Sequence, residues 1–351
     1  MTETRPSASQ GARPRLHALD LLRGLCALGV AAYHFSLWGE VALWPPLAGT
    51  LAIFGTYGVS VFFILSGYSL AHAYERHFRE SLSAGQVLQY FRRRLGRLGP
   101  LFAIVVLLSI AGKVLVTGKP IDPYATVANM ALFFGLVNPA STPVVGGWSI
   151  GIEVVFYVLF PTLLLLRKTM PLVALLSIFA TAWLSRDLSL FPSLAEGWGV
   201  YVHPANHFVF FAMGVFMRLA DHRTPTVKPL VFVAILSAAV AAMVLFAANT
   251  SELQLVTGWR RALLVAISIG LVGLSGKLEV TGRAVGVCSL FAGLSYPLYL
   301  IHPLIYFGAK SRVSASPWLL LGLLFFAAVM AVLIDRWVDD PIQRRLKRVG
   351  W

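Results

Sequence analysis

The sequence predicts an all-α protein: a polytopic transmembrane helical bundle of about ten spans, with one possible re-entrant helix. Of the 351 residues, 58% are hydrophobic and only 13% are charged, a balance typical of membrane proteins. Long apolar runs recur from end to end of the chain, and a membrane span takes about 20 such residues. Because no stretch is long and polar enough for a separate soluble domain, we predict a single integral domain.

The ten predicted spans account for most of the chain. In order they cover residues 18–38, 51–73, 98–116, 148–166, 170–187, 205–220, 229–248, 258–278, 284–309 and 317–338. A transmembrane domain over 18–338 is therefore expected between a polar N-terminal tail (1–17) and a basic C-terminal tail (339–351). No small-residue cleavage site follows the first apolar run, so we expect it to be retained rather than removed as a signal peptide.

The segment 124–137, YATVANMALFFGLV, is apolar but too short for an ordinary crossing. We therefore expect a re-entrant or interfacial helix here. If the segment did cross, the count would become eleven and one terminus would change sides.

The basic residues predict the orientation of the bundle. Most of them lie in the N-terminal tail, in alternate loops and in the C-terminal tail. The opposite side holds only Lys119, Arg186, Arg260, Arg261, Lys310 and Arg312. The positive-inside rule then places both termini in the cytoplasm. The formal charge of +14 is explained by this orientation, and no nucleic-acid partner is expected.

The first apolar run, LDLLRGLCALGVAAYHF, contains Asp20, Arg23 and His34. An ionisable side chain at membrane depth costs about 2.5 to 3.5 kcal/mol or more, and such residues mark functional sites. Arg23 and His34 are eleven positions apart, which is close to three helical turns and about 16 Å along the axis. They should therefore share one face of the first span, Arg23 toward the cytoplasm and His34 toward the outside.

Other spans are predicted to bring polar groups to the depth of His34. Glu153 lies near the outer start of its span, and His302 lies near the outer end of 284–309, where Pro297 and Pro303 predict a kink. His302 alone is equally consistent with an ordinary interhelical hydrogen bond. Candidate substrate-binding residues in this region are Tyr57, Ser60, Trp148, Ser149, His207, Tyr299 and His302.

A cluster of arginines precedes the third span, in QYFRRRLGRLGP: Arg92, Arg93, Arg94 and Arg97. Guanidinium groups bind phosphate oxygens in a bidentate manner, so the cluster is a candidate phosphate site on the cytoplasmic side. Without other context, such a cluster more often sets topology or contacts anionic lipid.

Six blocks resemble, in order, the acyltransferase-3 family of integral-membrane O-acyltransferases. They are LDLLRGLCALGVAAYHF, YGVSVFFILSGYSL, FRRRLGRLGPLF, GGWSIGIEVVFYVLFP, GLSYPLYLIHP and VDDP. The resemblance covers nearly the whole chain and implies a bacterial enzyme of the cytoplasmic (inner) membrane that O-acylates sugars and related acceptors. It implies the stand-alone form, without the soluble hydrolase-like domain that many members carry.

The resemblance also implies roles for particular residues. The family's Arg and His of the first span fall on Arg23 and His34, its Trp-Ser-Glu block falls on Trp148, Ser149 and Glu153, and its cytoplasmic basic segment is associated with acyl-CoA. Two blocks depart from the family pattern. Ile152-Glu153-Val154 stands where two adjacent acidic residues are usual, and Asp339-Asp340-Pro341 replaces the usual Glu-x-Pro.

These observations suggest transfer of an acyl group, most simply acetyl, from cytoplasmic acyl-CoA to a hydroxyl of an envelope or exported carbohydrate or glycolipid. His34 is the expected general base, with Glu153 fixing its tautomer, because histidine ordinarily changes charge near neutral pH. Arg23 is expected to bind the donor or to stabilise developing charge. A covalent acyl-enzyme route stays open, and no metal is expected, since both cysteines lie in apolar helices.

Two other function classes compete with the enzyme. A proton-coupled transporter or flippase of a glycolipid or small molecule also uses buried His, Arg and Glu, but it predicts two related halves with broken helices, and no internal repeat is seen. A non-catalytic membrane sensor gives no reason for Arg23 and His34 to share one face. The sequence leaves the acceptor, the acyl chain and the oligomeric state open.

Overall fold

In the computed structural model, ten helical segments among the described residues are long and apolar enough to cross a membrane. The structure describes residues 15–80, 82–118, 122–221, 226–247, 250–310 and 316–351. The predicted tail up to residue 14, and Lys119 and Arg312 among the predicted loop charges, lie outside these ranges. The predicted all-α bundle of ten spans is confirmed, and the chain is an integral membrane protein.

The spans follow the predicted order closely. Their main helices are α1 (His17–Trp38), α2 (Pro45–Glu80), α3 (Ala84–Thr117), α6 (Trp148–Leu165), α7 (Met170–Leu188), α9 (Pro204–Ala220), α10 (Pro229–Ala247), α12 (Gly258–Ser275), α13 (Ala284–Ala309) and α14 (Pro317–Ile334). Short helices α8 (Trp198–Tyr201) and α11 (Glu252–Leu255) lie in the connections.

Helices α2 and α3 are much longer than their predicted spans. Prolines 45 and 46 begin α2, and a capping box between Ser83 and Gln86 begins α3. At about 1.5 Å per residue, α2 is about 54 Å long, well beyond a hydrocarbon core of about 30 Å. The four arginines at 92, 93, 94 and 97 therefore lie within helix α3, the first two exposed and the other two partly buried.

The segment 124–137 does not form a crossing. It consists of α4 (Pro123–Met130) and α5 (Phe134–Val137), separated by a turn in which Leu132 has a φ of 64°. This left-handed residue breaks the helix. Asp122 caps the start of α4 through the backbone N–H groups of Tyr124 and Ala125.

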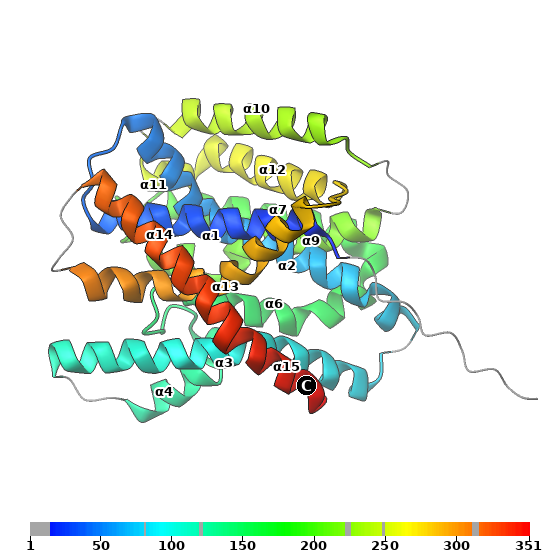
Figure 1. Ribbon diagram of the computed structural model, residues 1–351. Helices are drawn as coiled ribbons and strands as arrows, with labels where there is room; N and C mark the ends of the chain where they lie inside the picture. Colours follow the sequence, from blue (N-terminus) through cyan, green and yellow to red (C-terminus); the bar gives the residue numbers. More distant parts are fainter. Residues whose placement is uncertain (1–14, 81, 119–121, 222–225, 248–249, 311–315) are drawn as a thin grey trace, which may run out of the picture.

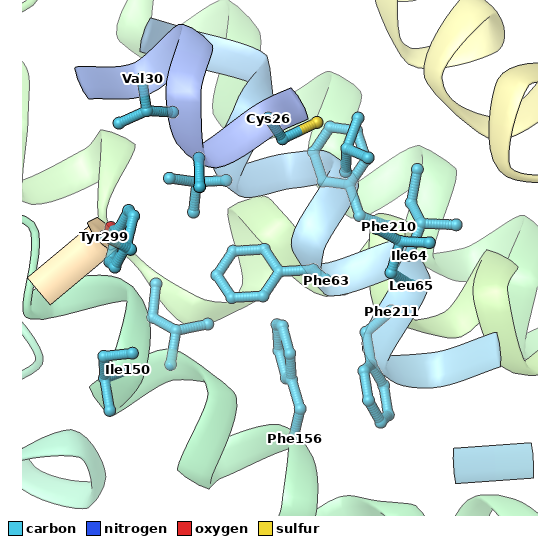
Figure 2. Close-up of a cluster of buried hydrophobic side chains, with 14 of the residues drawn as sticks. Cys26, Val30, Phe63, Ile64, Leu65, Ile150, Phe156, Phe210, Phe211 and Tyr299 are labelled. Atoms are coloured by element: carbon cyan, nitrogen blue, oxygen red, sulfur yellow. The ribbon is translucent and has the colours of Figure 1, made fainter. Parts of the chain in front are cut away.

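Helix α1 runs through the middle of the bundle, with α10 along one side and α3 and α4 along the other (Figure 1). The core lies where α1, α2, α6, α9 and α13 meet. Side chains from these five helices fill it: Cys26, Val30, Phe63, Ile64, Leu65, Ile150, Phe156, Phe210, Phe211 and Tyr299 (Figure 2). A Cβ on Gly67 of α2 would lie 2.3 Å from the carbonyl oxygen of Phe211, so glycine permits the close approach of α2 and α9.

The last span continues as one helical stretch to Arg348. A π-helical turn, η3 (Asp335–Asp339), joins α14 to α15 (Asp340–Arg348). Residues predicted as part of a C-terminal tail thus form helix α15. The extra residue in a π turn changes which side chains face inward, and Asp339 is buried here against α3.

Candidate active site

Two histidines from different helices form one hydrogen-bonded pair. Nδ1 of His34 on α1 lies 2.9 Å from Nε2 of His302 on α13. The ring centroids are 5.1 Å apart and the ring planes differ by only 10°, so the imidazoles lie end to end in nearly one plane. We call these residues the histidine pair. The predicted contact of Glu153 with His34 is wrong: His302 is the partner of Nδ1, and Glu153 accepts from Ser66 and Tyr157 instead.

The hydrogen bonds assign the protons of the pair. Nδ1 of His302 lies 3.1 Å from the carbonyl oxygen of Leu298, and since a carbonyl only accepts, this Nδ1 carries the proton. Nε2 of a neutral His302 is then an acceptor, and Nδ1 of His34 donates to it. Nε2 of His34 keeps its lone pair and has no hydrogen-bond partner within the described part of the chain. His302 is buried, whereas His34 is partly exposed.

Pro303 explains why α13 offers His302 an additional acceptor. In a regular helix the N–H of residue 303 would donate to the carbonyl of Tyr299, but proline has no N–H. The Tyr299 carbonyl therefore lacks its helical donor. It is a second backbone acceptor for the side chain of His302, beside the carbonyl of Leu298. The proline thus favours the tautomer of His302 that leaves Nε2 facing His34.

Arg23 lies three turns from His34 on α1. Its guanidinium donates to Ser69 Oγ at 2.7 Å and, less favourably, to the carbonyl of Leu65 at 3.4 Å, both on α2. Asp20, one turn earlier on α1, accepts from Arg23 at 3.1 Å. The Arg23 side chain is 29% exposed. The cation is therefore oriented by a buried carboxylate and by α2, and part of it stays accessible.

Glu153 of α6 lies on the Arg23 side of the site. Its Oε1 accepts hydrogen bonds from Ser66 Oγ at 2.7 Å and from the Tyr157 hydroxyl at 2.6 Å. Ser66 is one turn from Ser69 on α2, and the charge of Glu153 acts on Arg23. We call Arg23, Ser66, Ser69, Glu153 and Tyr157 the arginine layer.

The start of α6 contacts Tyr299, and Tyr299 lies next to the histidine pair. Ser149 Oγ lies 2.8 Å from the Tyr299 hydroxyl, and both hydroxyls lie within hydrogen-bond distance of the carbonyl of Gly146. Tyr299 is one turn before His302, and their ring centroids are 6.1 Å apart. Of the predicted substrate-binding residues, His302 is thus part of the pair, Tyr299 lies next to it on α13, and Ser149 of α6 reaches it through Tyr299.

The remaining predicted substrate-binding residues are buried in the core. The rings of Trp148 and His207 are 5.2 Å apart, and Nε2 of His207 donates to the carbonyl of Tyr201 at 2.8 Å. The Tyr57 hydroxyl donates to the carbonyl of Leu255, and Ser60 is 2% exposed. The hydrogen-bonding donors of Tyr57 and His207 are thus engaged by the protein itself.

The structure divides the predicted arginine cluster into two parts. Arg97 forms an ion pair with Asp339 and lies over the ring of Tyr296, 5.3 Å from its centroid. Arg94 donates to the Tyr74 hydroxyl at 3.4 Å. The neighbouring residues 92 and 93 are exposed arginines. Arg97 and Arg23 are thus each paired with a carboxylate, that of Asp339 and that of Asp20, and both keep part of their side chains accessible.

The sequence analysis did not identify Ser69, Tyr157 or Trp38 as part of the site. Ser69 follows Ser66 by three residues in SGYS, which places both serines on one helix face. Trp38 follows His34 by one turn, and its indole stacks on the imidazole. Helical spacing from Ser66, Glu153 and His34 was the available signal for Ser69, Tyr157 and Trp38 respectively.

The side chains gathered at this end of the site are cationic rather than metal-ligating. Within the described ranges, no three His, Cys, Asp or Glu side chains gather as a metal site requires. Arg23 and Arg97 are partly exposed, with side chains 29% and 39% accessible, and guanidinium groups suit phosphate oxygens. Arg23 and His34 lie about 16 Å apart along α1.

Comparison with known proteins identifies a family for this chain. A family model described as an acyltransferase domain matches residues 16–335. The chain is 26% identical over 167 residues to the peptidoglycan O-acetyltransferase OatA of Listeria monocytogenes serovar 1/2a, a match covering 44% of this chain and 25% of that protein. It is 28% identical over 189 residues to the O-acetyltransferase OatA of Staphylococcus aureus strain NCTC 8325, covering 50% of this chain and 29% of that protein.

These matches cover only part of each relative. The chain spans between about a quarter and three tenths of the length of the two curated proteins. No solved structure gives a significant match.

Proposed function

The chain belongs to the acyltransferase family whose model covers residues 16–335, and we propose that it is a membrane O-acyltransferase. The proposed donor is cytoplasmic acyl-CoA, most simply acetyl-CoA. The proposed acceptor is a hydroxyl of a carbohydrate or glycolipid of the cell envelope or of an exported product. Two relatives are named O-acetyltransferases and one of these names specifies peptidoglycan, which supports an acetyl donor and a glycan acceptor.

The free Nε2 of His34 is the observation on which this proposal depends. A hydroxyl is a poor nucleophile at neutral pH and needs a base within hydrogen-bond reach. His34 presents an unprotonated nitrogen from a partly exposed ring, while its Nδ1–H is held by His302. As His34 becomes positively charged, His302 continues to accept from Nδ1 and so stabilises the imidazolium. This is the role that the carboxylate has in a Ser-His-Asp triad.

The proposed reaction needs no acyl-enzyme. Nε2 of His34 takes the proton of the acceptor hydroxyl as its oxygen attacks the thioester carbonyl. The tetrahedral intermediate then collapses, the carbon–sulfur bond breaks, and the CoA thiolate leaves. The proton on His34 passes to this thiolate, which restores the neutral pair.

The arginine layer is proposed to hold the donor. At about 16 Å from His34, Arg23 is too far away to contact the reacting carbonyl, so we assign it to the CoA phosphates or to the pantetheine arm. An extended pantetheine arm bridges such a distance. The exposed Arg92 and Arg93 add positive charge along α3, near Arg97, which is itself paired with Asp339. This assignment places the Arg23 end of the bundle in the cytoplasm, as the distribution of basic residues predicts.

Mass spectrometry of cell-envelope glycans tests the proposal. Cells that produce the protein should carry glycans heavier by one acyl group than cells that lack it. His34→Ala and Arg23→Ala should both lose this difference while the proteins stay inserted in the membrane at wild-type levels. Full acylation by His34→Ala would exclude it as the base, and unchanged glycans in cells with the wild-type protein would exclude a glycan acceptor.

A further inference from the structure

Trp38 covers the histidine pair with its indole ring. It follows His34 by one turn on α1, and the two ring centroids are 4.6 Å apart with planes parallel within 5°. The indole is also parallel to His302 within 7°, at a centroid distance of 6.0 Å. Because the two imidazoles lie end to end in one plane, a single flat indole faces both of them.

The position of Trp38 is fixed by the helix that carries His302. Tyr306 and Phe307 of α13 contact the indole, with ring centroids 5.3 Å and 5.0 Å away. Tyr306 is buried and is one turn beyond His302. The same two helices therefore set both the histidine pair and the ring that covers it.

We propose that Trp38 is a positioning residue for acyl transfer, which keeps the histidine pair in one plane and stabilises its positive charge. This inference rests on the proposed function, in which His34 takes a proton from the acceptor. The electron-rich face of an aromatic ring attracts a cation, tryptophan does so best, and centroid distances up to about 6 Å are effective. Both imidazoles lie within that range of the indole.

The geometry also predicts which kinetic constant depends on Trp38. The positive charge forms only as the hydroxyl proton moves to His34, so the attraction to the indole is stronger in the transition state than with donor merely bound. An interaction of this kind affects kcat and leaves the KM of a distant donor site unchanged. The donor contacts proposed for Arg23 lie about 16 Å away along α1.

Membrane vesicles from cells that make the full chain provide the assay. [14C]acetyl-CoA is the donor, the glycans of the vesicles are the acceptor, and the rate is expressed per molecule of protein. Trp38→Leu, which removes the aromatic face, should lower kcat about 10- to 30-fold with an unchanged KM for acetyl-CoA. Trp38→Phe, which keeps a smaller ring, should recover most of this loss. The matched control is Trp44→Leu, because Trp44 is 70% exposed and lies in the loop after α1.

A double-mutant cycle separates positioning from simple packing. If Trp38 acts through the pair, Trp38→Leu should cost much less in kcat when His302→Ala, which removes the pair, is already present. Wild-type kcat in Trp38→Leu, equal losses in the Phe and Leu variants, or independent effects in the cycle would overturn the inference. His34→Gln separates a failure of the proposed function from a failure of the role proposed for Trp38. If it stays active, the proposed function fails. If it is inactive while Trp38→Leu matches the wild type, only this inference fails.

Discussion

His302 accepts the Nδ1–H of His34 across 2.9 Å, while its own Nδ1–H is directed to the carbonyl of Leu298. The backbone of α13 thus determines which nitrogen of a residue on α1 is free. In the proposed reaction, a neutral imidazole held in one tautomer by a helix takes the orienting role that a carboxylate has in a Ser-His-Asp triad. A neutral partner avoids placing another charge at membrane depth.

Substitution of His302 should lower kcat, and the loss should be larger when no hydrogen-bond acceptor remains for Nδ1 of His34. Glutamine keeps a carbonyl oxygen that can accept from Nδ1 of His34, so His302→Gln should lose about tenfold in kcat. His302→Ala should lose about 100-fold, because the tautomer and the imidazolium are both left unsupported. Steady-state kinetics with acetyl-CoA measures both constants, and the donor KM should stay at its wild-type value. Equal activity of the wild type and His302→Ala would contradict the assigned pair.

Pro303→Ala should lower the activity without lowering the thermal stability. The new N–H of residue 303 would donate to the Tyr299 carbonyl and compete with the side chain of His302, so we expect kcat to fall about three- to tenfold. Thermal stability should be unchanged or higher, since a proline inside a helix costs about 3 kcal/mol. Pro297→Ala in the same helix is the control and should retain its activity. Loss of activity together with a lower melting temperature would instead indicate general damage to α13.

The number and order of the spans could be predicted from the sequence because hydrocarbon thickness fixes the length of an apolar run. The full extent of α2 and α3 could not. Their polar ends continue beyond the apolar part as helix, supported by the Ser83–Gln86 capping box and by the two prolines at residues 45 and 46. Hydropathy detects burial in lipid and does not detect where a helix ends in water.

The sequence placed Arg23 and His34 on one face because helical spacing within a single segment is fixed. It predicted similar depths for Glu153 and His302, but Glu153 lies with Ser66 on the Arg23 side of the site, away from the histidine pair. Hydropathy does not fix the exact depth of a side chain, nor which neighbouring helix it faces. Contacts between α1 and α13, and between α6 and α2, decide that His302 meets His34 and that Glu153 meets Ser66. Pairing between helices far apart in the sequence was therefore the part that could not be predicted.

The two parts of the arginine cluster should respond differently to substitution. Arg97→Gln leaves the carboxylate of Asp339, whose side chain is only 2% exposed, without its cation. Breaking such a pair from one side is strongly destabilising, and because Arg97 is itself partly exposed we expect about 1–3 kcal/mol. The melting temperature in detergent measures this loss. The paired change Arg97→Met with Asp339→Leu should restore much of the stability.

Substitution of the exposed Arg92 and Arg93 should instead weaken binding of the donor. The double variant Arg92→Gln, Arg93→Gln should raise the KM for acetyl-CoA about three- to tenfold, because long-range attraction for the CoA phosphates is lost. Its melting temperature should not change. This effect should weaken at high salt, whereas the stability effect of Arg97 should persist because that pair is partly buried. A stability loss in the double variant would assign these residues to the fold.

Variants of Glu153 test whether this residue orients His34, as the sequence predicts, or supports the donor site together with Ser66 and Tyr157, as its contacts indicate. Its carboxylate accepts from Ser66 and Tyr157 and acts on Arg23, so its variants should alter use of the donor. Glu153→Ala leaves two buried hydroxyls without their acceptor and should raise the KM for acetyl-CoA about tenfold. Glu153→Gln keeps an acceptor oxygen and should recover most of that loss, with kcat within about threefold of wild type. If Glu153 oriented His34, the glutamine variant would instead lose orders of magnitude in kcat at constant KM, as a triad does when its carboxylate becomes an amide. Steady-state kinetics of the two variants therefore decides whether the catalytic base depends on α6 or on α13.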